Sequence, residues 1–218
     1  MKENAPHLIT SIFRKAWALA IFEPLVLILV LTLLTPPYVI MDYIVPEEGI
    51  PAAWLIISLF VLALQIAVMH RTFVKQDWIE FRHDVSAGFY SRAFGQNFIS
   101  VIAIIAGLLL LVLPGLFLAV RWSLSMPILL ARDCGIIDSL RQSWKMTSAY
   151  FWPIFGTLSL AYLPFIFAIV MIIIFPEPTS ALWGLISVEL VTSVSILFGW
   201  YVQIAFYQHI KNEIDLSS

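Results

Sequence analysis

Residues 98–132, FISVIAIIAGLLLLVLPGLFLAVRWSLSMPILLAR, contain only two charged side chains, Arg121 and Arg132. A transmembrane helix needs roughly 20 apolar residues to cross about 30 Å of hydrocarbon. Together with the few residues before it, this stretch accommodates two such helices. Proline lacks the backbone N–H that continues a helix, so Pro114-Gly115 predicts a turn between two antiparallel membrane spans.

Apolar runs of similar length lie on both sides of this hairpin. With 61% hydrophobic and 12% charged residues, the composition is far from that of a soluble surface, which carries roughly 25–35% charge. The predicted fold is all-α, a polytopic transmembrane helical bundle of six spans that forms a single integral membrane domain over residues 1–218. The predicted spans cover 16–35, 52–70, 94–113, 116–131, 151–175 and 181–207.

The basic residues fall on one side of the membrane when the chain is threaded through these spans. Eleven of the twelve Lys and Arg residues lie in the N-terminal segment, in the connections near 70–93 and 132–149, or after the last span. Arg121 is the exception, because it lies towards the opposite side. Basic residues in short loops stay in the cytoplasm, so both termini are predicted to be cytoplasmic.

Two predicted cytoplasmic segments, 77–93 and 136–148, have the spacing of amphipathic helices. Their apolar residues recur every three or four positions opposite charged ones, which is typical of helices that lie in the headgroup plane. The alternative is that each segment extends the span that follows it. The predicted apolar face of 136–148 consists of Ile136, Ile137, Leu140 and Trp144. The residues expected to meet lipid at this interface are Arg82, Arg92, Arg141, Trp144 and Lys145.

Three ionisable residues within the predicted spans need partners, since a charged side chain at mid-bilayer costs about 2.5–3.5 kcal/mol. Arg121 and Glu189 are predicted at similar depths, and a buried ion pair would satisfy both. In the alternative, Arg121 extends alone to the outer headgroups while Glu189 is protonated or meets water. Glu23 lies in the inner third of the first span, where Gln65 and Gln203 are at depths that allow a hydrogen bond.

No motif for catalysis or for a cofactor is present. The chain has no Gly-x-Ser-x-Gly, His-Glu-x-x-His or phosphate-binding Gly-Lys loop. Glu80 and His83 could share a metal ion, but a di-metal site of that kind needs a second Glu-x-x-His, and a solvated helix face is the favoured interpretation. Cys134 is the single cysteine, which excludes an internal disulfide. We therefore expect no enzyme activity, no cofactor and no metal site.

One part of the chain carries a pattern that occurs in known membrane proteins. Its residues are Leu113-Pro114-Gly115-Leu116, Arg121-Trp122-Ser123-Leu124, Pro127, Gly135, Ser139-Leu140, Ser143-Trp144 and Phe151-Trp152. The pattern resembles the YciC-like bacterial inner-membrane proteins and the membrane domain of some glycerophosphodiester phosphodiesterases. The resemblance implies a six-helix bacterial membrane protein without an assigned activity. The phosphodiesterase domain is absent from this chain, so that activity is not carried over.

These features lead to two hypotheses of different classes. The leading one is a non-catalytic protein of the bacterial cytoplasmic (inner) membrane that binds lipid or a partner protein in envelope maintenance. Its expected partners are anionic lipid headgroups at the cytoplasmic face, or another membrane protein; the net charge of -2 gives no reason to expect nucleic acid. The alternative is a small transporter or ion pathway that uses Glu23, Arg121 and Glu189. A polar stripe with a water-accessible cavity would favour the transporter, and an open lateral groove would favour lipid binding.

Overall fold

The structure, a computed structural model, describes residues 5–22, 24–44, 50–76, 87–175 and 182–217. The regular elements in these ranges are all α-helices, which confirms the all-α fold class. The helices are α1 (Ala5–Phe22), α2 (Pro24–Ile44), α3 (Ile50–Lys75), α4 (Ala87–Leu110), α5 (Val112–Trp122), α6 (Ser125–Arg132), α7 (Ile136–Thr147), α8 (Phe151–Ile174) and α10 (Leu182–Ser217).

The lengths and composition of the helices are those of a multi-pass membrane protein. Within the described ranges, 5 helical segments are long and apolar enough to cross a membrane, and they lie in α3, α4, α5–α6, α8 and α10. A sixth crossing is added if α1 and α2 form one bent span. α8 matches the predicted span 151–175 closely, whereas α3 and α10 continue beyond the predicted spans 52–70 and 181–207.

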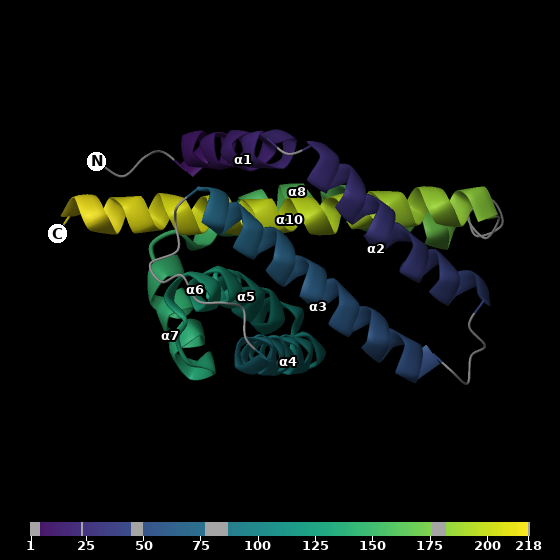
Figure 1. The fold of residues 1–218 in the computed structure, drawn as a ribbon, viewed down its shortest axis with the longest axis horizontal. Coiled ribbons are helices and arrows are strands. Elements are labelled where there is room, and N and C mark those ends of the chain that lie inside the picture. Colours follow the sequence, from purple (N-terminus) through teal and green to yellow (C-terminus); the bar gives the residue numbers. More distant parts are fainter. Residues whose placement is uncertain (1–4, 23, 45–49, 77–86, 176–181, 218) are drawn as a thin grey trace.

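Figure 1 shows α10 along the longest axis of the molecule, with α8 behind it and α1 packed over both helices. α10 has 36 residues, about 54 Å at 1.5 Å per residue, and therefore exceeds the thickness of a bilayer core. α2 and α3 run obliquely, and α4 is seen nearly end-on. Both chain ends lie at the same end of the molecule (Figure 1).

The core lies where α10 meets α1, α2, α3, α6 and α8. Residues 200–202 and 204–207 of α10 are buried around the whole circumference of the helix. α6 is buried from Ser125 to Ala131, so this short helix is an internal element rather than part of the surface. A helix that is buried all round occupies the centre of a bundle, and α10 and α6 form that centre here.

The first predicted span, 16–35, is divided between two helices rather than formed by one. α1 and α2 meet at an angle of 89°, and Glu23 itself lies outside the described residues. Pro24 is the first residue of α2, a position where the missing N–H costs no helical hydrogen bond. Pro36 and Pro37 lie inside α2 and do not end it; the neighbouring Leu34 is fully buried, so packing holds this part helical.

The turn between the spans predicted at 94–113 and 116–131 lies earlier than expected. Leu111 is the extended residue, with φ -162° and ψ 135°, and Pro114 falls in the first turn of α5, where its missing donor is not needed. Gly115 instead forms a close crossing of α4 and α5. A Cβ atom on Gly107 would lie 2.9 Å from the Cα and N atoms of Gly115, so only glycine allows this approach.

The two predicted interfacial helices have different outcomes. Most of 77–93 lies outside the described residues, and from Ala87 the chain already belongs to α4. Arg92 is therefore part of a long membrane helix, which corresponds to the alternative of an extended span. The segment 136–148 does form a separate helix, α7 (Ile136–Thr147), which confirms the helix, while its position at the membrane interface stays a prediction.

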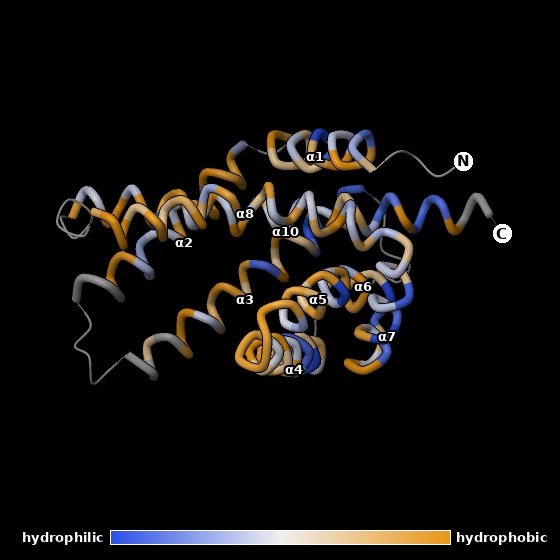
Figure 2. Tube along the Cα trace, turned by 180° about the vertical axis from the view of Figure 1, so that it is seen from behind, coloured by the Kyte–Doolittle hydropathy of each residue, from blue (hydrophilic) through white to orange (hydrophobic). Residues whose placement is uncertain are grey.

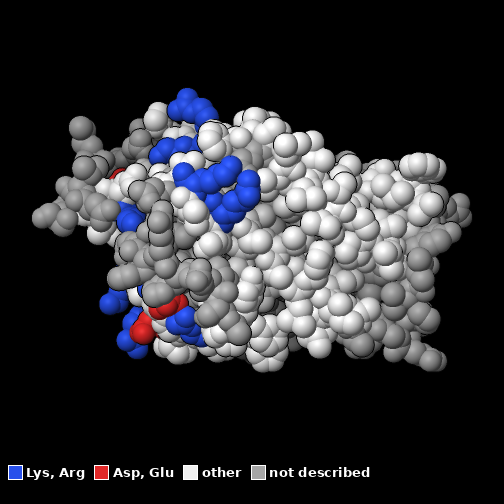
Figure 3. All heavy atoms as spheres, viewed as in Figure 1, with Lys and Arg blue, Asp and Glu red and all other residues white. Residues whose placement is uncertain are grey.

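The charged side chains gather at one end of the molecule. In Figure 3 the Lys and Arg residues lie at the end that carries both termini, while the remainder of the visible described surface is uncharged. Figure 2 shows the same division along the chain, since hydrophobic residues dominate α2, α3 and α8, and hydrophilic residues concentrate in α7 and in the C-terminal turns of α10. The charge asymmetry of the sequence is therefore also an asymmetry in space.

Candidate functional site

Arg121 lies at the C-terminal end of α5, where it is enclosed by aromatic rings. Its guanidinium carbon is 5.0 Å from the centres of the Phe117 and Trp144 rings and 5.9 Å from that of Phe151. Its Nη1 donates a hydrogen bond of 3.3 Å to the carbonyl oxygen of Trp144. Cation–π contacts of this kind stabilise a charge that has no carboxylate partner.

The helix break after Trp122 explains how α7 is attached. α5 ends there and α6 begins at Ser125, so carbonyl groups at the end of α5 lack their usual helical donors. The carbonyl oxygen of Arg121 accepts hydrogen bonds from Ser143 Oγ at 2.7 Å and from Thr147 Oγ1 at 3.2 Å. Both hydroxyl residues are fully buried, and they fix α7 against α5.

This attachment buries Leu140 in the bundle, although it was predicted to belong to the lipid-facing side of α7. The buried residues are Ser139, Leu140, Ser143 and Thr147, so hydroxyl groups rather than large apolar side chains form most of the inner face. Ile137 and Trp144 remain 59% and 39% exposed. They share the outer face with Arg141 and Lys145, which are also exposed. We call these four residues, Ile137, Arg141, Trp144 and Lys145, the outer face of α7.

The structure does not bring Arg121 and Glu189 together. Arg121 contacts α7 and α8, and it makes no ion pair with any residue that the structure describes. Glu189 is 8% exposed on α10 and acts electrostatically on Tyr38 of α2. The sequence set Arg121 apart from the other basic residues, but the fold places it beside α7, which also carries Arg141 and Lys145.

Arg92 has a partner that the sequence did not identify. Its guanidinium forms a salt bridge with the carboxylate of Asp133. Asp133 is the residue that follows the last turn of α6, and its backbone is in the left-handed region at φ 45°. A second basic residue, Arg132, donates a 2.7 Å hydrogen bond from Nη1 to Gln142 Oε1 of α7. Arg82 lies outside the described residues, as do Glu80 and His83.

Cys134, between α6 and α7, is a partly buried thiol. Burial raises its pKa, which keeps the thiol protonated and poorly nucleophilic at neutral pH. Among the described residues, no group of three or more His, Cys, Asp or Glu side chains could hold a metal ion.

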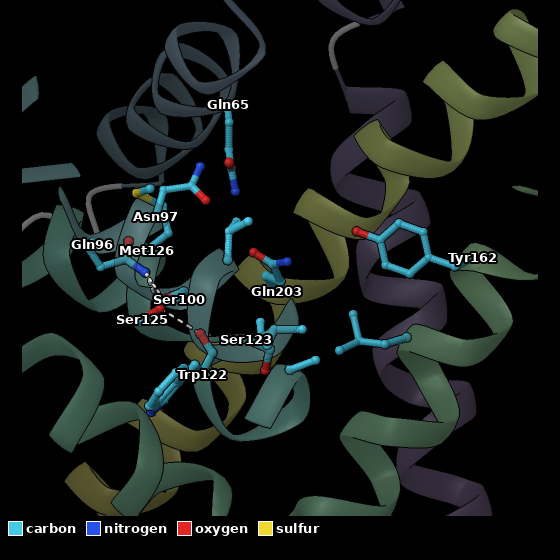
Figure 4. A pocket seen from close by; sticks show the side chains of 14 residues that line it. Gln65, Gln96, Asn97, Ser100, Trp122, Ser123, Ser125, Met126, Tyr162 and Gln203 are labelled. Atoms are coloured by element: carbon cyan, nitrogen blue, oxygen red, sulfur yellow. Dashed lines mark hydrogen bonds between the residues drawn. The ribbon is translucent and has the colours of Figure 1, made fainter. Parts of the chain in front are cut away.

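A polar cavity lies inside the bundle, and only part of its lining could be predicted from the sequence. It has a volume of about 250 Å³ and lies between α3, α4, α5, α6, α8 and α10. Figure 4 shows the carboxamides of Gln65, Asn97 and Gln203 directed towards a common space, with the Tyr162 hydroxyl on the far side. Gln65 and Gln203 were expected at similar depths, as possible hydrogen-bond partners of Glu23, whereas Asn97 is inconspicuous in sequence because it follows polar residues at the start of a span. We call this space the amide cavity.

One wall of the amide cavity has an ordered hydrogen-bond chain (Figure 4). Ser125 Oγ donates to the carbonyl oxygen of Trp122 at 2.6 Å, so its lone pairs are left to accept from Gln96 Nε2 at 2.7 Å. Gln96 Nε2 also reaches Ser100 Oγ at 3.2 Å. The orientation of the Gln96 amide is thereby fixed, and its Oε1 is buried without a hydrogen-bond partner in the described structure.

A second cavity of about 340 Å³ adjoins the first between α2, α3 and α4. The two cavities share Gln65, Asn97 and Val101 as lining residues. The second cavity is lined mainly by apolar side chains, of which Leu55 and Phe98 are each 56% exposed on the outside of the bundle. We call it the side cavity, because it connects the amide cavity with the apolar outer surface.

Comparisons with protein-family models, with curated proteins and with solved structures find no match to this chain.

Proposed function

We propose that this chain is a non-catalytic protein of the bacterial cytoplasmic membrane that binds anionic lipid headgroups in support of the envelope. The single observation that carries the proposal is the outer face of α7. Arg141 and Lys145 are exposed beside Ile137 and Trp144, so basic and apolar groups point away from the bundle together. Both termini are cytoplasmic in this proposal, since they lie at the basic end of the molecule.

The physical properties of this face fit a negatively charged interface. A Lys or Arg near an anionic membrane surface contributes about 1 kcal/mol. A Trp ring favours the headgroup level, where one end is apolar and the other is wet. The buried hydroxyls of Ser143 and Thr147 hold α7 against α5, so the outer face is presented by a fixed helix rather than by a loop.

Membership of the YciC-like family is part of the same proposal. Several residues that carry the resemblance, among them Ser143, Trp144 and Phe151, lie around Arg121 where α5, α7 and α8 meet. Their common location supports the idea that the pattern preserves the attachment of α7. The proposed family membership adds no activity, so the protein remains a binding protein in this proposal.

The test removes both charges of the outer face. The double variant Arg141→Gln and Lys145→Gln should retain roughly 30-fold less phosphatidylglycerol through purification, because two contributions of about 1 kcal/mol each are lost. Native mass spectrometry of the detergent-solubilised protein measures the retained lipid. The matched control is Arg14→Gln with Lys15→Gln, which removes the same charge from exposed positions of α1.

If both double variants lose the same amount of lipid, the loss depends on the net charge of the protein alone, and a lipid site on α7 is refuted. If the α7 variant keeps the parent's lipid, the surface is better explained as a docking face for another membrane protein. Trp144→Ala should lower the amount of retained lipid more than either charge change, since it also removes a ring that contacts Arg121.

The proposed orientation is tested separately with a cysteine at the exposed position Asn212, in a Cys134→Ser background. A membrane-impermeant maleimide should label Asn212→Cys only after the cells are permeabilised. Labelling in intact cells would overturn the cytoplasmic C-terminus.

The alternative of an ion pathway gains little from the described residues. Arg121 faces α7 and Glu189 faces α2, so these two residues share no cavity with each other. The polar groups that do converge inside the bundle are uncharged carboxamides, which do not carry protons between them.

A further inference from the structure

The amide cavity contains hydrogen-bonding groups that the described part of the chain does not satisfy. The carboxamides of Gln65, Asn97 and Gln203 make no hydrogen bond with any other residue that the structure describes. Leaving polar groups unpaired in apolar surroundings is costly, and natural bundles usually pair them across helices. Three unpaired carboxamides on three different helices, directed at one space (Figure 4), therefore point to an occupant.

The chemistry of the lining defines the occupant's polar group. Each carboxamide offers both N–H donors and a carbonyl acceptor, so the matching group must accept and donate hydrogen bonds. A hydroxyl does both, whereas an ionised phosphate diester only accepts. None of the described residues that line the two cavities is charged, and burying a phosphate there without a cation would be strongly unfavourable. The cavity is therefore suited to an uncharged, hydroxyl-bearing group.

The side cavity identifies where that group comes from. Water also donates and accepts, and about 250 Å³ has room for roughly eight molecules at about 30 Å³ each. Water alone, however, leaves the apolar side cavity unexplained. That cavity runs from Asn97 and Gln65 to Leu55 and Phe98 on the outer surface, which suits an acyl chain that continues from a polar group inside to the bilayer outside.

We propose that the amide cavity binds the headgroup of a lipid with an uncharged hydroxyl, and that the side cavity receives part of its acyl chain. Diacylglycerol is the simplest lipid of this class. This site is distinct from the outer face of α7, which is proposed to bind anionic headgroups. The two proposals fail independently, because the α7 variants leave the lining of both cavities unchanged.

The experiment uses the full chain in detergent and a diacylglycerol with a photoreactive group in its acyl chain. A phosphatidic acid with the same photoreactive chain is the charged comparison. Diacylglycerol should label peptides of α3 and α4 that line the side cavity, and phosphatidic acid should label them at least about fivefold less. Equal labelling by both lipids would overturn the proposed selectivity for an uncharged headgroup.

The variants Gln65→Leu, Asn97→Leu and Gln203→Leu test the polar contacts one at a time. Each should weaken labelling by diacylglycerol about fivefold, which corresponds to one hydrogen bond of about 1 kcal/mol. The matched control is Gln208→Leu, at a position on α10 that lines neither cavity. Unchanged labelling in all three cavity variants, or an equal loss in the control, would overturn the proposal.

Thermal unfolding of the same variants separates binding from folding. Because the three carboxamides have no hydrogen-bond partner among the described residues, leucine should leave the unfolding temperature unchanged or raise it. A general loss of stability would show that the amides serve the fold and would overturn the proposal. As a second route, Val101→Trp should block labelling by filling the space shared by both cavities while keeping every amide.

Competition identifies the source of the hydroxyl group. Excess unlabelled dioctanoylglycerol should suppress the labelling of α3 and α4, and free glycerol at the same concentration should not. If glycerol competes equally well, the cavity is a site for a soluble polyol and the lipid proposal is wrong.

Discussion

The crossing of α4 and α5 depends on two glycines, and replacing either one should destabilise the protein. A Cβ atom on Gly107 would lie 2.9 Å from the backbone N and Cα of Gly115 and 3.2 Å from the carbonyl carbon of Pro114. A Cβ atom on Gly115 would lie 2.6 Å from the backbone N of Leu108. These obstacles are backbone atoms, so no side-chain rotation can relieve the overlap, and the two helices must move apart.

The expected magnitude is a balance of two opposite effects. Alanine in a helix interior is favoured over glycine by about 1 kcal/mol. Forcing extra atoms into a packed contact typically costs about 1–3 kcal/mol, and rigid backbone neighbours place this contact in the upper half of that range. The variants Gly107→Ala and Gly115→Ala should therefore lower the free energy of unfolding by about 1–2 kcal/mol.

Gly156 provides the matched control, because it also lies inside a helix, α8. A Cβ atom there would meet Ile9 Cδ1 at 3.0 Å, the end of a flexible side chain that can move. Gly156→Ala should consequently be neutral or stabilising, by up to about 1 kcal/mol. The assay is reversible unfolding in mixed micelles of increasing dodecyl sulfate content, followed by tryptophan fluorescence. If Gly107→Ala is as stable as Gly156→Ala, the close crossing does not exist.

Three further predictions concern α7 and its surroundings. Ser143→Ala removes a buried hydrogen bond to the Arg121 carbonyl and should lower the free energy of unfolding by about 1–2 kcal/mol. The control Ser148→Ala, at an exposed position, should change it by less than about 0.5 kcal/mol. Equal effects of the two substitutions would contradict the attachment of α7 to α5. The effects of Arg121→Leu and Glu189→Leu on the free energy of unfolding should be additive within about 0.5 kcal/mol in a double-mutant cycle, because the fold gives the two residues different partners. A larger coupling energy would support an ion pair between them. Burial raises the pKa of Cys134, so a smaller fraction of this thiol is ionised at pH 8 than of an ordinary thiol. Its alkylation by iodoacetamide should therefore be slower in the folded than in the denatured protein and should accelerate as the pH rises. A faster reaction in the folded protein would refute the raised pKa.

The position of the membrane helices and the separation of charge could be predicted from the sequence. Hydrophobic length is a local property, because about 20 apolar residues suffice to cross a bilayer wherever they occur. α8 therefore lies close to the position expected, and α3 covers its predicted span and continues beyond it. The basic residues collect at one end for a similar reason, since each is fixed by its place at the end of an apolar run. α7 was recognisable because a helix with polar and apolar faces shows its period in the sequence.

The partners of each helix could not be predicted in this way. In a soluble protein, apolar residues mark the buried face, but a membrane helix is apolar on its lipid-facing side as well, and contacts between helices depend on small residues and hydrogen bonds. The inner face of α7 illustrates the consequence, because Leu140 is buried in the bundle beside Ser139 and Ser143, although it was predicted to face the lipid. Arg121 was assigned to Glu189 by depth alone, and depth does not specify which helices are neighbours.

The sequence by itself determined an all-helical membrane protein with a basic end, because hydropathy and charge act on each segment separately. Tertiary structure decided the enclosure of Arg121, because the rings of Trp144 and Phe151 come from helices distant in sequence. The amide cavity is the clearest case. Gln65, Asn97 and Gln203 belong to α3, α4 and α10, and only the packing of those helices brings three isolated carboxamides to one space.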